Sequence, residues 1–217
     1  MPEDKPGNLK KLMHVFEHLR LNPERPQIRQ IRRAVELLRQ GHFVVVPTDT
    51  TYVLLCLPQA GDAIAGIRAF RRLDDHHMWS VVCADLSQAA NCVRIDNVAH
   101  RILKRCLPGP YTFILPASST LPRRIFGKRK DVGIRMPDHP VCQMLLEELG
   151  EVALATTLQL PGQDEPEYDP DEFVARIRHL SCGIIDAGWG GMVPTTVVDL
   201  CDGEPVLLRE GAGEWPA

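Results

Sequence analysis

Hydrophobic residues recur along this chain with two periods, one typical of helices and one typical of strands. Between Ile28 and Leu38 the apolar residues follow helical spacing, and Gly41 supplies a stop. Further helices are predicted over residues 60–72, 96–106, 140–149 and 170–178. Strands are predicted over residues 43–46, 80–83, 111–115, 132–135, 152–156, 183–185, 195–200 and 205–208. Helices and strands mixed without strict alternation predict a single α/β domain built on a mixed sheet.

The first 25 residues are expected to form an N-terminal appendage, with the main domain running over residues 26–213. Met13, Phe16 and Leu19 are spaced to line one face of a helix that ends before Asn22. His14 and His18 are four residues apart, which is a spacing that metal sites use on helices. Because no third ligand accompanies them, we expect two exposed histidines and no metal site.

The most informative pattern lies where an apolar run, residues 43–46, stops at Pro47 and four small polar residues follow. These are Thr48, Asp49, Thr50 and Thr51, and Tyr52 then begins a second apolar run. A buried strand that breaks into turn-forming polar residues places them at the end of a sheet, where small ligands bind in open α/β folds. An ordinary strand–turn–strand connection is the alternative interpretation of the same pattern.

Composition and charge narrow the class of protein. The 217 residues are 44% hydrophobic and 24% charged, as in a globular domain, and the net charge of −3 excludes a polycation. A nucleic-acid contact would therefore need a local basic patch. The densest basic run could contact tRNA or double-stranded RNA, with a solvated loop as the alternative. It consists of Arg123, Arg124, Lys128, Arg129 and Lys130.

Several features argue against a membrane or secreted protein. No apolar run reaches the roughly 20 residues that span a bilayer, and the first residues lack the apolar core of a signal peptide. The seven cysteines form no Cys-x-x-Cys pair, and Cys56, Cys83 and Cys106 lie in apolar surroundings. We expect reduced cysteines, no membrane association and a cytoplasmic location.

Hydroxyl and arginine side chains gather near predicted element ends, a composition that suits a phosphate or carboxylate ligand. Each residue alone is more simply a solvated or structural group, so the joint pattern carries the inference. The chain contains no Gly-x-x-x-x-Gly-Lys-Ser/Thr loop, no strand followed by Gly-x-Gly-x-x-Gly, and no Gly-x-Ser-x-Gly elbow. No catalytic nucleophile or acid–base pair is therefore assigned.

Five motifs in order, between about residues 22 and 211, resemble those of the YrdC/YciO family, whose members include threonylcarbamoyl-AMP synthases. The signatures concerned are Pro-Thr-Asp-Thr-x-Tyr-Gly-Leu, Trp-Pro-Gly-Pro-x-Thr, Val-Gly-Val-Arg-x-Pro-x-His-Pro, Pro-Ser-Thr-Val-Val-Asp and Leu-Arg-x-Gly. They correspond here to residues 47–54, 107–112, 132–140, 194–199 and 208–211.

The resemblance implies a twisted mixed α/β sheet flanked by helices, with a concave, positively charged face. It implies a pocket for ATP, L-threonine and bicarbonate, with Mg²⁺ accompanying ATP. The product would be threonylcarbamoyl-adenylate plus pyrophosphate. Partner proteins that modify tRNA would then transfer the threonylcarbamoyl group to adenosine 37. Such chemistry needs positioning and charge neutralisation more than a protein nucleophile.

The family motifs also assign roles by position. The threonine and bicarbonate ligands would be Thr50, Tyr52 and Arg135. The nucleotide ligands would be Arg71, Arg72, His77, Thr157, Gln159, Thr195, Thr196 and Arg209.

The chain departs from the synthase branch in three places. Arg71-Arg72-Leu73 stands where synthases carry Lys-x-Arg, Thr157-Leu158-Gln159 replaces Ser-x-Asn, and Val53 replaces a glycine. A lost charge-assisted hydrogen bond is worth roughly 1.5–3 kcal/mol, which weakens phosphate binding about ten- to a hundredfold unless Arg72 or His77 compensates.

These departures resemble the YciO branch and leave three functions open. The chain is a threonylcarbamoyl-adenylate synthase, a protein that binds a nucleotide, double-stranded RNA or tRNA without efficient synthesis, or a hydrolase of a related acyl-adenylate.

Overall fold

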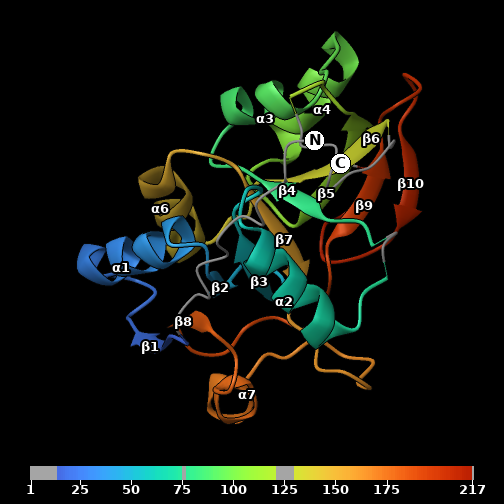
Figure 1. Cartoon of the computed structure of the whole chain (residues 1–217). Helices are drawn as coiled ribbons and strands as arrows, with labels where there is room; N and C mark the ends of the chain where they lie inside the picture. Colours follow the sequence, from blue (N-terminus) through green and yellow to red (C-terminus); the bar gives the residue numbers. More distant parts are fainter. Residues whose placement is uncertain (1–13, 75–76, 121–129, 217) are drawn as a thin grey trace, which may run out of the picture.

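The computed structural model describes residues 14–74, 77–120 and 130–216 (Figure 1). Its strands are β1 (Phe16–Arg20), β2 (Phe43–Pro47), β3 (Tyr52–Cys56), β4 (Ser80–Val82), β5 (Tyr111–Pro116), β6 (Asp131–Arg135), β7 (Ala153–Thr157), β8 (Cys182–Asp186), β9 (Thr196–Asp199) and β10 (Val206–Arg209). The helices are α1 (Ile28–Arg39), α2 (Gly61–Arg71), α3 (Leu86–Cys92), α4 (Asn97–Cys106), α6 (Pro140–Leu149) and α7 (Pro170–Ile177).

All ten strands form one mixed sheet in the order β1-β8-β2-β3-β7-β4-β6-β5-β9-β10. The pairs β1–β8, β2–β8, β4–β6 and β5–β9 are parallel, and the remaining neighbours are antiparallel. The single α/β domain with a mixed sheet is thus confirmed.

Helices cover both faces of the sheet around β2 and β3. The ring of Phe43 lies beside Gly66 of α2, whereas the next residue, Val44, lies beside Leu37 of α1 over Gly183. Successive side chains of a strand point to opposite faces, so α1 and α2 lie on opposite sides. Helix α6 packs on α1 (Figure 1). Double coverage explains why every residue of β2 and β3 is buried.

The predicted N-terminal helix is wrong: Phe16–Arg20 is strand β1. It pairs in parallel with β8 from Phe16 opposite Cys182 to Arg20 opposite Asp186. The helical pattern covered fewer than two turns, too short to be stable alone, whereas β8 offers a full ladder of backbone partners. The sheet therefore begins inside the segment expected to be an appendage, and residues 1–13 lie outside the described residues.

Side-chain pairs attach β1 to its neighbours. Glu17 forms an ion pair with Arg33 of α1, and His18 lies 2.7 Å from the carboxylate of Asp186. The Arg33 guanidinium holds the pKa of Glu17 below its ordinary value. The strand is thus bound to both α1 and β8, which a sequence pattern alone does not show.

Helix α3 was not predicted. It begins after Asp85, whose carboxylate accepts a hydrogen bond of 2.8 Å from the Gln88 amide. An acidic N-cap before residues 86–92 was the signal that could have found it.

The cysteines behave as expected: all seven are free, and all but Cys201 are buried. Burial raises the pKa of the Cys56 and Cys83 thiols to about 12. None of the helices in the described segments has the length and apolar character needed to cross a membrane.

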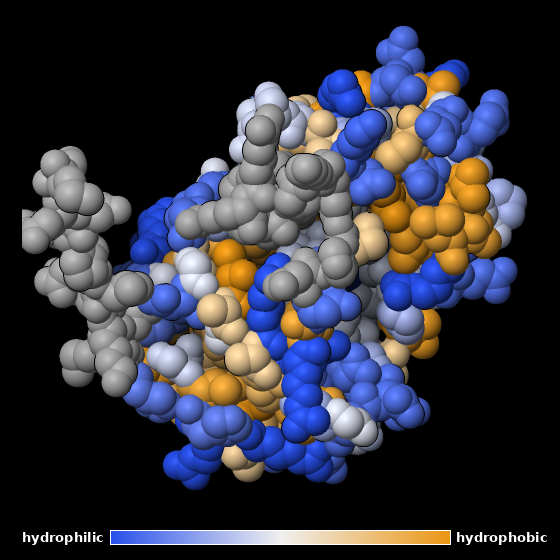
Figure 2. Space-filling model, turned by 45° about the vertical axis from the view of Figure 1, so that its right-hand side comes forward, coloured by the Kyte–Doolittle hydropathy of each residue, from blue (hydrophilic) through white to orange (hydrophobic). Residues whose placement is uncertain are grey.

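Strand β10 forms one edge of the sheet, and its Val206 and Leu208 side chains are about half exposed, at 53% and 54%. Figure 2 brings this side of the molecule forward and shows hydrophobic surface gathered toward the right, among hydrophilic surface. This edge of the sheet faces solvent, unlike the doubly covered strands β2 and β3.

Candidate functional site

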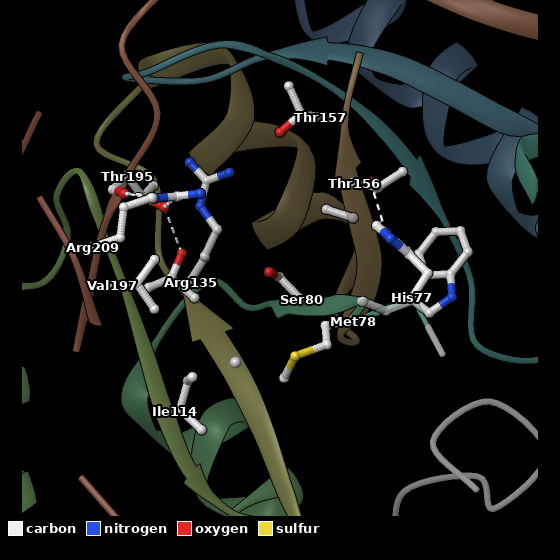
Figure 3. A pocket seen from close by; sticks show the side chains of 14 residues that line it. His77, Met78, Ser80, Ile114, Arg135, Thr156, Thr157, Thr195, Val197 and Arg209 are labelled. Atoms are coloured by element: carbon white, nitrogen blue, oxygen red, sulfur yellow. Dashed lines mark hydrogen bonds between the residues drawn. The ribbon is translucent and has the colours of Figure 1, made fainter. Parts of the chain in front are cut away.

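A cavity of about 300 Å³ lies over the half of the sheet formed by β4 to β7, β9 and β10 (Figure 3). It is lined by His77, Met78, Trp79, Ser80, Thr112, Ile114, Gly133, Arg135, Ala155, Thr156, Thr157, Thr195, Val197 and Arg209.

Strand periodicity explains how distant residues meet there. Three strands, and the segment that leads into β9, each contribute residues two positions apart, which point to the same face of a sheet. The pairs are Thr112 and Ile114, Gly133 and Arg135, Ala155 and Thr157, and Thr195 and Val197. The ligand site expected at a sheet end therefore lies over a sheet face.

Small residues line the centre of the cavity. Ser80 of β4 is paired with Gly133 of β6 and with Ala155 of β7. A Cβ at Gly133 would come within 3.0 Å of the Thr112 methyl group, so little space remains there for a larger residue. Three small neighbours in one row thus leave a hollow between larger ones.

Arg135 is the most constrained polar group of the cavity. Its side chain is only 7% exposed, and one terminal nitrogen donates a 2.9 Å hydrogen bond to Thr50 and lies 3.5 Å from Asp49. Burial lowers the pKa of Arg135, Asp49 opposes this shift, and the positive charge of Arg209 adds to it. Its Nε is buried without a hydrogen-bond partner.

The second guanidinium, that of Arg209, is held by the segment before β9. Its Nε and one terminal nitrogen donate to the Thr195 carbonyl at 3.1 and 2.8 Å. The Thr195 hydroxyl lies 2.8 Å from that of Thr112. Burial lowers the pKa of Arg209, and among the described residues no carboxylate forms an ion pair with it. Its charge is therefore available to a ligand.

The cavity is divided into polar and apolar parts. In Figure 3, Arg135, Arg209 and Thr157 surround the upper part, and Ile114 and Met78 lie below. Among the described lining residues there is no carboxylate. Two guanidinium groups beside an apolar floor suit a ligand with a flat apolar part and an anionic part, as in a nucleotide.

His77 lies at the opposite side of the cavity from Arg209. Its Nε2 is 3.0 Å from the Thr156 hydroxyl (Figure 3). Its ring meets Trp79 edge to face, with centroids 5.5 Å apart. These contacts direct the imidazole to Thr156 at the border of the cavity.

The structure brings five of the predicted site residues to the cavity wall, namely His77, Arg135, Thr157, Thr195 and Arg209. Thr50 lies directly behind the wall, where it receives the Arg135 hydrogen bond. The cavity-lining residues do not include Tyr52, Arg71, Arg72, Gln159 or Thr196.

The Tyr52 side chain packs against α7, outside the cavity. Its hydroxyl donates a 2.6 Å hydrogen bond to the Gly188 carbonyl, and its ring packs on Phe173 with centroids 5.0 Å apart. Burial raises the pKa of this phenol. The structure therefore gives Tyr52 a packing role and places no part of it in the cavity wall.

We expect Tyr52→Phe to lower the free energy of unfolding by about 1 kcal/mol, because the buried hydroxyl is lost together with its bond to the Gly188 carbonyl and the bond that it accepts from the Ala187 amide. Nucleotide affinity should not change, since the lost contact lies outside the cavity. Chemical denaturation and calorimetric titration of ATP measure the two quantities. A tenfold loss of affinity with unchanged stability would contradict the structural placement.

Thr196 and Arg72 also point elsewhere. Thr196 follows Thr195, so strand alternation turns it to the opposite face, where its hydroxyl donates to the Gly213 carbonyl at 2.6 Å. Arg72 ends α2 in the left-handed conformation, with φ of 53°, and is exposed. Only a tertiary structure could separate Thr195 from its neighbour.

Most of the predicted basic run falls outside the described residues, namely Arg123, Arg124, Lys128 and Arg129. Lys130 is described and exposed. Within the described segments, no group of three or more His, Cys, Asp or Glu side chains is placed to hold a metal ion.

Sequence reasoning did not assign Ser80, Trp79, Ile114 or Val197 to the site. Ile114 and Val197 are apolar residues of ordinary strand patterns, and Ser80 begins a three-residue strand. For Trp79, Ile114 and Val197 the only signal was a spacing of two residues from His77, Thr112 and Thr195, which does not show which face of the sheet is open. Ser80 had no such signal.

The family model Sua5_yciO_yrdC, described as telomere recombination, matches residues 36–211. The Escherichia coli (strain K12) protein YciO, described as uncharacterized, is 44% identical over 195 residues, covering 89% of this chain and 95% of that protein. The crystal structure of E. coli YciO superposes with a TM-score of 0.84 at 42% identity, covering 93% of this chain and 98% of that one.

Two further relatives carry functional names. The threonylcarbamoyl-AMP synthase of Bacillus subtilis (strain 168) is 34% identical over 188 residues, covering 84% of this chain and 53% of that protein. The crystal structure of P. abyssi Sua5 complexed with L-threonine has a TM-score of 0.78 at 30% identity, covering 91% of this chain and 57% of that one. This chain thus matches a little over half of each.

Proposed function

The chain belongs to the Sua5/YciO/YrdC family, and we propose that it is an ATP-dependent L-threonylcarbamoyladenylate synthase-like protein that serves threonylcarbamoyl modification of tRNA adenosine 37. The observation that carries the proposal is the pair Arg135 and Arg209 in one cavity with an apolar floor. The relative named threonylcarbamoyl-AMP synthase and the Sua5 complex with L-threonine support it.

In this proposal the two arginines divide the substrates between them. Arg135, with Thr50 behind it, takes the threonine carboxylate or bicarbonate. Arg209, with Thr195 and Thr157, takes the α-phosphate of ATP, and the adenine lies over Ile114 and Val197. Two neighbouring anion sites in one cavity bring the reacting atoms together without covalent catalysis (Figure 3).

The chemistry then needs no protein nucleophile. The threonine amine and bicarbonate give a carbamate and water. A carbamate oxygen forms a bond to the α-phosphorus, the bond from that phosphorus to the oxygen bridging to the β-phosphorus breaks, and pyrophosphate leaves with the electron pair. The guanidinium of Arg209 stabilises the negative charge that builds up on the α-phosphate oxygens.

Mg²⁺ would enter the site as a counter-ion that accompanies ATP. Asp49 is the carboxylate nearest to Arg135, and it is engaged by that guanidinium and by the Asp138 amide at 3.0 Å. The described residues therefore offer no preformed carboxylate cage, and the metal would be held chiefly by phosphate oxygens and water.

The decisive assay supplies ATP, Mg²⁺, bicarbonate and labelled L-threonine and measures threonylcarbamoyl-adenylate and pyrophosphate. Arg209→Ala should lower product formation at subsaturating ATP about ten- to a hundredfold, because a charge-assisted contact to phosphate is lost. Arg101→Ala on the exposed face of α4 is the matched control and should leave it unchanged. Equal activity of wild type and Arg209→Ala would refute the assignment.

A second candidate function is nucleotide binding without efficient synthesis. It is favoured by Arg71, the basic residue that this chain keeps from the synthase Lys-x-Arg motif. Arg71 is bonded to Thr157 and Gln159 and is not a lining residue. ATP binding by calorimetry with no product in the assay above would establish this candidate and overturn synthesis.

A further inference from the structure

Arg71 is engaged by this chain's own polypeptide at the back of the cavity wall. One terminal nitrogen donates to the Thr157 carbonyl, and the other donates a 2.8 Å hydrogen bond to Oε1 of Gln159. Thr157 lines the cavity, so the guanidinium lies just behind that wall. Burial lowers the pKa of Arg71, which reflects the cost of holding this charge away from water.

Gln159 is itself fixed in place. Its amide nitrogen donates a 2.6 Å hydrogen bond to the Gln163 carbonyl. Because one end of the amide is bonded to the backbone of the following loop, its oxygen is aimed at Arg71. An asparagine, one methylene shorter, would not span the same distance from the same backbone position. The contact is therefore a consequence of the longer side chain.

Because Arg71 is bonded to Thr157 and Gln159, few positively charged side chains of the described residues line the cavity. The cationic or titratable lining residues among those described are Arg135, Arg209 and His77, and the last is directed to Thr156. Asp49, 3.5 Å from Arg135, offsets part of one charge. Two guanidinium groups match one phosphate and one carboxylate. Among the described lining residues, no further charged partner remains for the β- and γ-phosphates of a nucleoside triphosphate.

We propose that Gln159 is a specificity-determining residue: together with the Thr157 carbonyl it holds Arg71 out of the cavity, and the site therefore binds nucleoside monophosphates and acyl-adenylates in preference to nucleoside triphosphates. This inference rests on the proposed function, because it concerns the same nucleotide site. It predicts that the cavity is better matched to the adenylate product than to ATP.

Calorimetric titration of the full chain with AMP and with ATP, each with and without Mg²⁺, tests the proposal. The wild type should bind AMP at least as tightly as ATP. Gln159→Ala should raise ATP affinity about tenfold, since one freed guanidinium contact to phosphate is worth at least that factor. AMP affinity should remain unchanged.

Two controls assign any gain to Arg71. Gln163→Ala keeps the main-chain carbonyl that Gln159 uses, so it should change neither affinity. The double variant Gln159→Ala/Arg71→Ala should lose the tenfold gain. Thermal unfolding checks that each variant is folded, and Gln159→Asn replaces Gln159→Ala if the latter is not.

Different outcomes would contradict the role of Gln159 and the proposed function of the nucleotide site. A wild type that prefers ATP over AMP more than tenfold, an unchanged affinity ratio in the Gln159 variants, or a gain that persists without Arg71 would overturn the role of Gln159 alone. Failure to bind either nucleotide would overturn the proposed function and this inference together.

Discussion

Replacing Arg135 with methionine is expected to abolish product formation and to lower the free energy of unfolding by about 3–5 kcal/mol, the cost of leaving one partner of a buried ion pair uncompensated. The partner is Asp49, whose side chain is only 9% exposed and whose Oδ1 has no hydrogen-bond partner. Activity falls for a separate reason, because the cavity loses one of its two guanidinium groups. Urea denaturation and the synthase assay measure the two effects.

The double variant Asp49→Asn/Arg135→Met separates stability from binding. Removing both charges leaves no buried carboxylate unpaired, so most of the lost stability should return. Product formation should remain absent, since no cation takes the place of Arg135. If the double variant is as unstable as Arg135→Met, the ion pair is not the origin of the effect.

The second large effect is expected at Gly191, in the connection between β8 and β9. A Cβ there would stand 2.0 Å from the Thr50 carbonyl oxygen and 3.0 Å from its carbon, both backbone atoms that cannot rotate away. Gly191→Ala should therefore destabilise the fold by about 3 kcal/mol. The turn that carries Thr50 must also move, which displaces the hydrogen bond that holds Arg135.

Gly61→Ala is the matched control for this prediction, because nothing lies within 4 Å of a Cβ at that position. Thermal unfolding and calorimetric titration of ATP on both variants measure the outcome. Wild-type stability together with wild-type affinity in Gly191→Ala would mean that the connection does not constrain the turn at Thr50.

Local sequence was sufficient where the determining interactions are themselves local. The apolar run that ends at Pro47 predicted β2, and Pro140 with Gly150 bounded α6 correctly. The motif residues Arg135, Thr195 and Arg209 were predicted as ligands, and they do line one cavity. Hydroxyl and guanidinium groups at set positions in strands reveal their chemistry without knowledge of the fold.

The prediction failed where another part of the chain supplies the partner. Phe16–Arg20 is a strand because β8 offers it a ladder, and β8 lies more than 160 residues away in the sequence. Tyr52 and Thr196 carry suitable chemistry but are directed to the Gly188 and Gly213 carbonyls. The sequence around Tyr52 and Thr196 does not show where those carbonyl groups lie in the folded chain.

By itself the sequence determined the family, the α/β class and the types of side chain available for an anionic ligand, because these follow from ordered motifs and from residue periodicity. Only the tertiary structure decided which face of the strands is open, and that face selects Thr195 over Thr196. It likewise decided that Arg71 is bonded to Gln159 and is not a lining residue. Both outcomes depend on strand pairing and helix coverage between distant segments, which no short stretch of sequence specifies.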